Sequence, residues 1–401
     1  MNYLNKYLWT ILLFLVSLGG KAQVQFAKEG WVAATEQAKK ENKNIFIDIY
    51  FTGCMPCAKM DKNVFTNEKV YSLLNEHFVS FKTDILKEEV GKELCMRYGV
   101  GGFPTFVFLS PDLKVIDIVS GYYGADKFAA LLQGVKNHRK EELKEYSSAL
   151  DRDFPEFYKT FYLDRKQKIS SETIVSFLEG QKDLTDELPY LVMSTMGVPE
   201  KYLDFYLEHA QQLAQKYSRS QTRNKVSRIL AYQAGKLGEN NQAEAFEQAL
   251  NKAKPVFTQE EWHKFADRWM ETFYLASKNA EWYMDKLESE GFDWQDKSNA
   301  LAQVVLDAKE DTPTLKRLAK VYSQNEQNFT DASDYYKAAL IQLYLKKYNQ
   351  AEAFTETALN AKKNITLKED DMLVLQAAIR NQALQGFTPK KATNPKPFTL
   401  D

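Results

Sequence analysis

The strongest constraint on this chain is a buried-strand pattern that runs directly into two closely spaced cysteines, within residues 45–60 (IFIDIYFTGCMPCAKM). The first part is apolar, β-branched or aromatic and is interrupted only by Asp48, which predicts a strand that is covered on both faces. Thr52 and Gly53 then predict a turn. Residues at helical spacing follow the turn and predict a helix that begins at the cysteines: Cys57, Met60 and Val64.

The two cysteines, Cys54 and Cys57, have the spacing and the placement of a redox-active pair. A thiol at the start of a helix faces free N–H groups and the positive end of the helix dipole, which favour the thiolate over the thiol. Such surroundings can lower a cysteine pKa from about 8.5 to roughly 3.5–7.5. We therefore predict that Cys54 is the exposed attacking thiolate and that Cys57, one turn further on, is the less exposed resolving thiol.

A structural disulfide and half of a zinc site are the two competing interpretations of this pair. Zinc needs four ligands, and Cys95 together with four scattered histidines supplies no second spaced pair. A structural disulfide leaves the placement between a strand and a helix unexplained. The sequence therefore favours redox chemistry, without a metal and without a cofactor. Cys95 falls on the apolar face of a predicted helix, and we expect it to be a buried bystander.

Residues 1–22 have the order of a secretory signal peptide, with Lys6, a run of mostly apolar residues, and small residues up to Ala22. The apolar run is shorter than the roughly 20 residues of a membrane-spanning helix. We expect cleavage after Ala22 and export to a periplasm, with no stable membrane span afterwards; an uncleaved anchor is the alternative. Three cysteines are too few for a disulfide scaffold, which agrees with one active pair and one bystander.

The charge and the length of the chain bound its partners and its organisation. The formal net charge is −1, so there is no basic excess of the kind that binds nucleic acid or an anionic membrane. At 401 residues, with 44% apolar residues, the chain is long enough and apolar enough to form two or three domains with cores of their own.

The first of these domains is predicted at residues 23–136 and combines helices with strands. Strands are expected at 45–50, 78–82, 105–109 and 114–119, with helical patterns before, between and after them. The last two strands are joined so tightly that they must form an antiparallel hairpin. The expected order α-β-α-β-α-β-β-α gives an open sheet with helices on both faces.

This domain resembles the thioredoxin fold. Asp48 lies six residues before Cys54, where thioredoxins keep a buried aspartate, and residues 98–105 (YGVGGFPT) resemble the segment that carries the family's cis-proline. The helix led by Trp31, the FTGC before the pair and the KM after it are closer still to the C-terminal domain of the DsbD-type thiol–disulfide interchange reductases. We therefore predict an α/β thioredoxin fold for residues 23–136.

The resemblance implies roles for further residues. Asp48 would accept the proton of the resolving thiol, and burial would raise its pKa toward the working range. Phe103 and Pro104, joined by a cis peptide bond, would bind substrate together with Met55. The alternative for Asp48 is a hydrogen-bonded core carboxylate with a structural role, and the alternative for Pro104 is an ordinary trans proline. The lysine that often neighbours the aspartate is expected to be absent, with Ser80 as the nearest equivalent.

Beyond the α/β domain the pattern becomes helical. Residues 137–145 are predicted to be a charged linker or helix extension, 146–385 an all-helical domain, and 386–401 a flexible, proline-punctuated tail. The hexapeptide NQAEAF occurs at 241–246 and again 108 residues later, about three units of a helix-pair repeat. The second copy resembles the second helix of a tetratricopeptide unit; a non-repetitive bundle is the alternative.

Two functions fit these features. As an enzyme, the chain would be an exported thiol–disulfide oxidoreductase that reduces or exchanges disulfides in client proteins and is re-reduced by an upstream thiol electron donor. No histidine lies between the cysteines, which favours the reducing direction. As a binding module, the helical domain would hold a protein partner while the thioredoxin-like domain clamps or senses it.

Overall fold

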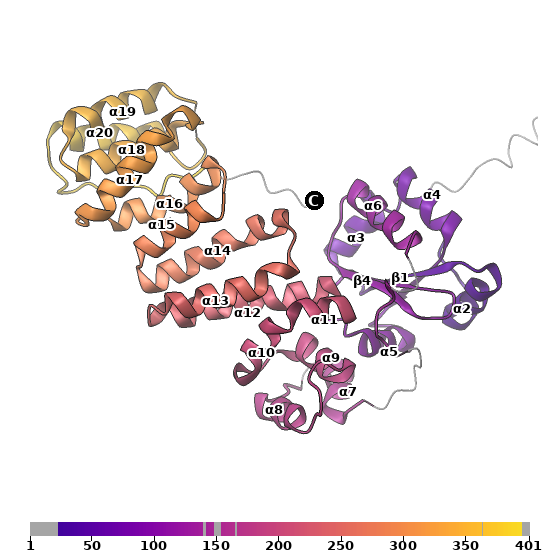
Figure 1. The fold of residues 1–401 in the computed structure, drawn as a ribbon. Coiled ribbons are helices and arrows are strands. Elements are labelled where there is room, and N and C mark those ends of the chain that lie inside the picture. Colours follow the sequence, from indigo (N-terminus) through magenta and orange to yellow (C-terminus); the bar gives the residue numbers. More distant parts are fainter. Residues whose placement is uncertain (1–22, 139–141, 148–153, 165–166, 363, 395–401) are drawn as a thin grey trace, which may run out of the picture. The chain divides into compact units, whose positions relative to one another are not determined.

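The computed structural model describes residues 23–138, 142–147, 154–164, 167–362 and 364–394 (Figure 1). The predicted signal peptide lies outside these residues. The chain divides into two compact units, and the division falls between Ile229 and Leu230, within helix α12 (Arg219–Glu239). None of the described helices has both the length and the apolar character that a membrane crossing requires.

The first unit opens with the predicted α/β domain. Strand β1 pairs in parallel with β2 and antiparallel with β3, and β3 and β4 form the predicted hairpin, so the strand order is β2-β1-β3-β4. The thioredoxin-like arrangement of the prediction is therefore confirmed. The elements of this domain, in chain order, are α2 (Gly30–Glu41), β1 (Asn44–Tyr50), α3 (Met55–Asn63), α4 (Glu68–His77), β2 (Phe78–Asp84), α5 (Glu89–Tyr98), β3 (Thr105–Leu109), β4 (Val115–Ser120) and α6 (Ala125–Lys136).

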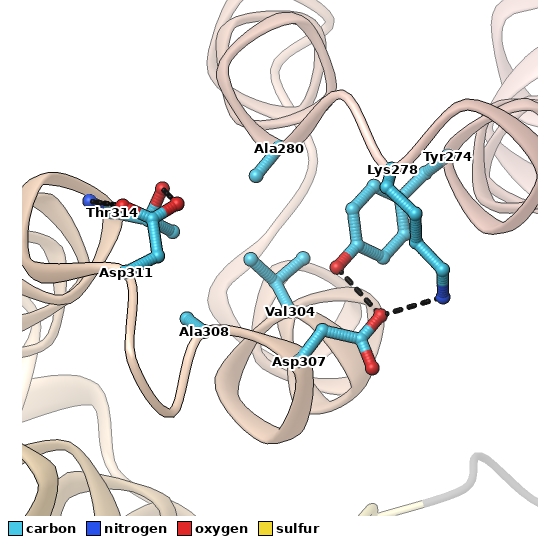
Figure 2. A pocket seen from close by; sticks show the side chains of 8 residues that line it. All are labelled: Tyr274, Lys278, Ala280, Val304, Asp307, Ala308, Asp311 and Thr314. Carbon is cyan, nitrogen blue, oxygen red and sulfur yellow. Dashed lines mark hydrogen bonds and ion pairs between the residues drawn. The ribbon is translucent and has the colours of Figure 1, made fainter.

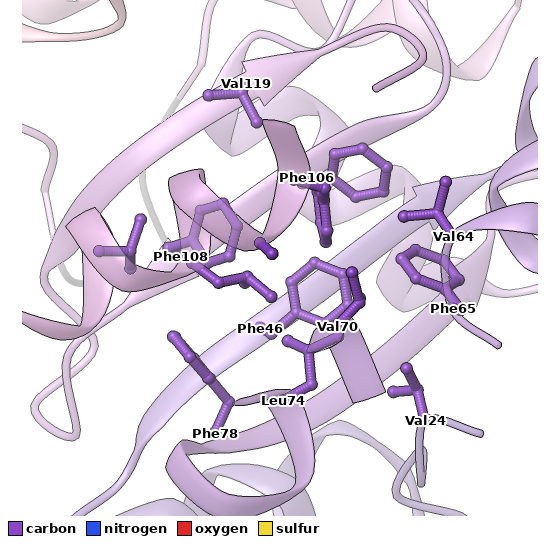
Figure 3. Close-up of a cluster of buried hydrophobic side chains, with 14 of the residues drawn as sticks. Val24, Phe46, Val64, Phe65, Val70, Leu74, Phe78, Phe106, Phe108 and Val119 are labelled. Carbon is purple, nitrogen blue, oxygen red and sulfur yellow. The ribbon is translucent and has the colours of Figure 1, made fainter. Parts of the chain in front are cut away.

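Helices cover both faces of this sheet (Figure 1). One face carries α3, α4 and α6 over an aromatic core (Figure 3). At its centre the Phe46 ring lies 5.8 Å from Phe106 and 5.5 Å from Phe108, between centroids. Helix α2 packs on the other face, where Trp31 lies 5.4 Å from Phe81. Burial of these large rings is a main source of the stability of the sheet that carries the site.

Further helices complete the first unit. Helix α7 is fixed to α5 by the Tyr158 hydroxyl, which donates to the Met96 carbonyl at 2.8 Å. The residue directly before α12 reaches β4, where the Ser218 hydroxyl donates to the Ile118 carbonyl at 2.8 Å. These helices therefore belong to the same compact unit as the α/β domain. They are α7 (Glu156–Leu163), α8 (Ser171–Glu179), α9 (Glu187–Met196), α10 (Leu203–Glu208), α11 (Ala210–Lys216) and the first part of α12, with a 3-10 turn at Glu200–Tyr202.

The second unit, described as far as residue 394, is helical, as predicted. After α12 its elements are α13 (Ala243–Ala253), α14 (Gln259–Ser277), α15 (Ala280–Ser289), α16 (Trp294–Asp307), α17 (Thr312–Gln324), α18 (Ala332–Tyr344), α19 (Tyr348–Asn360) and α20 (Glu369–Arg380), with 3-10 turns at Lys254–Val256 and Glu326–Asn328. Helices α18, α19 and α20 pack closely against one another.

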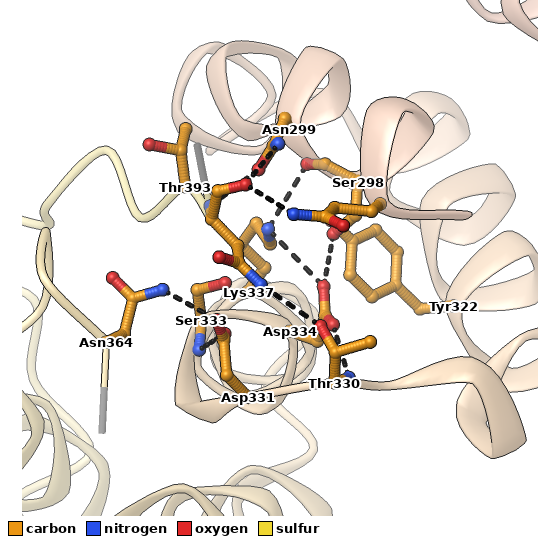
Figure 4. A network of polar contacts seen from close by, with 12 residues as sticks. Ser298, Asn299, Tyr322, Thr330, Asp331, Ser333, Asp334, Lys337, Asn364 and Thr393 are labelled. Carbon is orange, nitrogen blue, oxygen red and sulfur yellow. Dashed lines mark hydrogen bonds and ion pairs between the residues drawn. The ribbon is translucent and has the colours of Figure 1, made fainter. Parts of the chain in front are cut away.

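A buried polar network joins α16 to α18 in this unit (Figure 4). The Lys337 ammonium donates to the Ser298 carbonyl at 3.2 Å and lies 3.5 Å from Asp334, which also accepts from the Ser298 hydroxyl. Burial lowers the pKa of Lys337 to about 8, although Asp334 opposes that shift. The hydrogen bonds and the ion pair of this network compensate the cost of burying the two charges, so we assign a structural role to it.

The two copies of the hexapeptide do not occupy equivalent positions. The turns α12–α13 and α18–α19 each contain a left-handed residue, Asn241 with φ 48° and Lys346 with φ 61°. The first copy begins at that residue and the second begins three residues after it. Ala351 is consequently fully buried, whereas its counterpart Ala243 is half-buried. The tetratricopeptide resemblance stays a prediction.

Candidate active site

A short turn after β1 presents the cysteine pair. The Thr52 hydroxyl donates to the carboxylate of Asp84, the last residue of β2, and the other oxygen of that carboxylate accepts from the Leu86 amide at 3.0 Å. Burial pushes the pKa of Asp84 upward, but these hydrogen bonds outweigh it and lower the pKa below its ordinary value. Gly53 then adopts φ 99°, a conformation that favours glycine. The turn is thus anchored to the adjacent strand.

Cys54 and Cys57 form a disulfide at the amino end of α3, with their Cα atoms 5.3 Å apart. Cys54 is the N-cap of the helix, and its sulfur accepts from the Cys57 amide at 3.2 Å. The helix therefore begins at the pair, as predicted. Both sulfurs are buried in this oxidised state, with an exposed fraction of 6% for Cys54 and 3% for Cys57, so Cys57 is the less exposed of the two, as predicted. The exposure of the Cys54 thiolate concerns the reduced pair and stays a prediction. Met55, between the two cysteines, is 70% exposed.

Asp48 is buried in the middle of β1, with an exposed fraction of 2%. Burial raises the pKa of its carboxyl to about 6, and the nearby Lys82 limits that rise. Its Oδ1 atom accepts no hydrogen bond from the residues that the structure describes. Asp48 is therefore an incompletely satisfied carboxylate that titrates close to neutral pH.

Lys82 occupies the place that the sequence analysis left without a lysine, so that prediction is wrong. The register of the parallel pair sets Lys82 opposite Asp48 and Ser80 opposite Phe46. The Lys82 ammonium lies 3.1 Å from Asp48 and also pairs with Asp61 on α3. The signal in the sequence was a lysine in the interior of a mostly apolar strand, but its partner depends on how β1 and β2 align.

This ammonium connects the interior of the sheet to the surface. Burial lowers the pKa of Lys82, but the carboxylates of Asp48 and Asp61 outweigh it and raise the pKa above its ordinary value. The Asp61 side chain is 48% exposed, whereas Asp48 is almost completely buried. Asp61 and Lys82 are residues that sequence reasoning missed, and together they form a charged path from the buried carboxyl to solvent.

The loop between α5 and β3 lies beside the cysteine turn. The Phe103–Pro104 peptide bond is cis, and the Pro104 carbonyl accepts from the Gly121 amide at 2.9 Å. The half-buried Phe103 ring packs edge-on against Phe51 at 5.3 Å between centroids. The Phe51 carbonyl in turn accepts from the Cys54 amide at 3.1 Å. The loop therefore contacts the segment that holds the cysteine pair through the rings of Phe103 and Phe51.

The structure gathers most of the predicted site residues but not all of them. Cys54, Cys57 and Phe103 lie on adjacent segments at one end of the sheet, and Met55 projects into solvent from the same turn. Asp48 lies within the sheet and is paired with a lysine. Cys95 is buried and outside any disulfide, as predicted.

A hollow also lies in the second unit, among α14, α15, α16 and α17 (Figure 2). Its volume is about 300 Å³. The Tyr274 hydroxyl and the Lys278 ammonium both donate to the same oxygen of Asp307, at 2.9 Å. No cysteine, histidine or serine is present among the described residues that line it. We assign this ion pair to structure, because it already satisfies the polar groups and carries no nucleophile with a base.

Comparison with known proteins places the α/β domain. A family model described as a thioredoxin-like domain matches residues 31–136. Thioredoxin-1 of Drosophila melanogaster is 36% identical over 87 residues, which cover 22% of this chain and 72% of that protein. An uncharacterised protein of Caenorhabditis elegans is 38% identical over 88 residues, which cover 21% of this chain and 12% of that protein.

The matches concern one part of the chain. The chain spans 12% of the length of the first curated relatives that it matches. Among solved structures, the DsbH oxidoreductase superposes with a TM-score of 0.27 and 21% identity, over 29% of this chain and 89% of that one. The helical residues beyond 136 lie outside the matched family model.

Proposed function

The chain belongs to the thioredoxin-like family through residues 31–136, and we propose that it is an exported thiol–disulfide oxidoreductase that reduces or exchanges disulfides in client proteins. The observation that carries this proposal is the Cys54–Cys57 disulfide at the amino end of α3, next to the Phe103–Pro104 loop. A cysteine pair at the start of a helix can exist as a dithiol or as a disulfide, and the proposed reaction uses the change between these two forms.

The proposed reaction begins with the reduced pair. The Cys54 thiolate attacks one sulfur of a client disulfide, a mixed disulfide forms, and the other client sulfur leaves as a thiolate. Cys57, after losing its proton, attacks the sulfur of Cys54 and releases the second client thiolate. The client disulfide gains two electrons, and the pair becomes the disulfide seen in the structure. An upstream thiol donor then returns two electrons to the pair.

The buried carboxyl supplies the proton step. With a pKa of about 6, Asp48 is mostly ionised at neutral pH and can accept the proton that Cys57 loses. Lys82, held between Asp48 and Asp61, keeps a positive charge beside this carboxylate in a region of low dielectric. We propose that Asp48 is the proton acceptor, with a pKa that burial raises and Lys82 holds near neutral pH.

Two features of the sequence support the proposed direction and the proposed compartment. Met55 and Pro56 stand between the cysteines, so no imidazolium stabilises the Cys54 thiolate, and the reduced form is a better electron donor than it would be with one. Residues 1–22 support export, which gives access to disulfide-containing clients. Clients and the upstream donor are thus proposed as the protein partners.

An insulin-reduction assay tests the activity. The full mature chain, reduced in advance, should cleave insulin disulfides, and Cys54→Ser should abolish this cleavage. Cys95→Ser is the matched control and should keep the activity, because Cys95 lies outside the disulfide. If the wild-type protein leaves insulin intact, or if Cys54→Ser cleaves it equally fast, the proposal is wrong.

A trapping experiment separates the enzyme from the alternative binding module. Cys57→Ser should accumulate mixed disulfides between Cys54 and client proteins, because the resolving thiol is gone. These adducts should disappear under a reductant and in the Cys54→Ser, Cys57→Ser double variant. Partners that are captured equally well by that double variant would instead support a helical binding module.

A further inference from the structure

A cavity of about 490 Å³ adjoins the cysteine site within the first unit. One of its walls is the loop between α5 and β3, including Phe103, and the other is the helical layer that follows the α/β domain. Its volume falls in the range of about 300–1,000 Å³ that is typical of binding pockets. The cavity is thus built jointly by the family's domain and by residues outside the matched region.

The helical wall is held rigidly against the loop. The Tyr158 hydroxyl fixes α7 to the Met96 carbonyl at 2.8 Å. From the first turn of α12, the Gln221 side-chain amide donates to the carbonyls of Tyr98 and Gly99 at 2.8 and 3.1 Å. Gly99 has φ 62°, and a Cβ there would lie 2.8 Å from a leucine side chain of α9. Such close approach and buried hydrogen bonding make the pocket pre-formed.

The lining is mainly apolar, with Gln167 as an uncharged polar member, and it is continuous with the redox site through Phe103. It includes the side chains of Phe103, Phe161, Tyr162, Ile169, Ile174 and Met196. Among the described lining residues only Lys168 is charged, and it is exposed. The Phe103 ring is shared: it lines the cavity and also packs on Phe51, whose carbonyl binds the Cys54 amide. A side chain in the cavity would therefore sit one aromatic ring away from the cysteine turn.

We propose that this cavity binds an aromatic or large aliphatic side chain of an extended client segment, close to the client cysteine that Cys54 attacks. This inference rests on the proposed function and adds a substrate class to it: unfolded or extended chains with apolar residues beside a disulfide. The location of the cavity supports this proposal, because an extended peptide paired with the Phe103 segment would present alternate side chains to pockets beside it. The chemistry supports it as well, because a mainly apolar lining that includes three aromatic rings favours apolar occupants.

Matched peptides test this proposal with the full mature chain. Each peptide carries one cysteine disulfide-bonded to a small thiol, with phenylalanine at one of the three following positions or alanine at all three. The wild type should reduce the best phenylalanine peptide with a kcat/KM about tenfold or more above the alanine peptide. Phe161→Ala should reduce this preference to about threefold or less, taken as the ratio of kcat/KM for the two peptides with that variant, and a small disulfide reagent reports the redox activity of each protein independently of the pocket.

The control lies on the same helix. Leu163 is 57% exposed and does not line the cavity, so Leu163→Ala should keep the full preference. Thermal unfolding by circular dichroism checks each variant, and Ile169→Ser, in a loop, replaces Phe161→Ala if that variant does not fold. A preference that survives Phe161→Ala, or equal rates for all peptides with the wild type, overturns the pocket proposal alone. A wild type that reduces neither the peptides nor the small disulfide overturns the proposed function as well.

Discussion

Replacing Asp48 with asparagine should stabilise the oxidised protein at neutral and alkaline pH. The folded-state pKa of Asp48 is about 6, against an ordinary value of 3.8, so the folded state disfavours the charged carboxylate by about two pKa units. At 1.36 kcal/mol per unit, this difference costs the folded state about 3 kcal/mol once the group is ionised. Asparagine has the same shape without the charge. The Lys82 ammonium keeps Asp61 as its partner in the variant.

The pH dependence gives this prediction its sign. Below pH 3.8 the carboxyl is protonated in both the folded and the unfolded chain, so the charge costs nothing. Between about pH 3.8 and 6 the unfolded chain ionises first, and the stability of the wild type falls as the pH rises. Above pH 6 the full cost is present. The gain from Asp48→Asn should therefore approach about 3 kcal/mol at pH 8 and fall to about 0.5 kcal/mol at pH 4.

Native-state hydrogen exchange of the β1 peptide is the appropriate assay, because it reports the opening free energy of this unit separately from the helical unit. Asp126→Asn is the control: Asp126 is 83% exposed, and the change should stay within about 0.5 kcal/mol at every pH. A β1 segment that is less stable in Asp48→Asn at pH 8, or a gain of equal size at pH 4, would refute the assignment of burial as the cause of the raised pKa.

Three other changes, the last of them with a matched control, have defined outcomes. Lys82→Met should raise the pKa of Asp48 above 6, since Lys82 is the main group that opposes the effect of burial; a carboxyl NMR titration that shows a lower pKa would contradict this. Gly99→Ala should cost the first unit about 1–3 kcal/mol, measured as lost exchange protection of α5, because it combines φ 62° with a contact at 2.8 Å. Gly238→Ala should destabilise the second unit by a similar amount in urea unfolding, since its Cβ would lie 2.9 Å from a backbone carbonyl of α14. Gly235→Ala, in the same helix with open space around it, should instead be neutral or stabilising by up to about 1 kcal/mol, and equal effects at the two glycines would refute the argument.

The parts of the site that sequence reasoning found are those encoded by local pattern. An apolar strand, a Thr-Gly turn and a helix that starts at a cysteine are readable within residues 45–60, and one charge in such a strand identifies Asp48. The hairpin of β3 and β4 was predictable because its connection is too short for any other arrangement.

The parts that it missed depend on alignment between distant segments. Lys82 meets Asp48 only because β1 and β2 pair in one register; a shift of two residues would set Ser80 there instead. The positions of the two hexapeptide copies also depend on their surroundings, since identical letters start at different points relative to the turns before α13 and α19. Identity of short segments does not establish identity of structural position.

The hydrogen bonds from Gln221 bear on how this protein is divided for experiments. The two carbonyls that it binds end α5, where a helix leaves acceptors unsatisfied, and the residue that supplies the donors lies 123 positions beyond Tyr98. A fragment cut at residue 136, where the family match ends, would lack Gln221. The two carbonyls, which lie just before Phe103 in the chain, would then lose their hydrogen-bond donor. The end of the family match therefore differs from the end of the compact unit, which extends into α12. A fragment designed for experiments should include the first turns of α12.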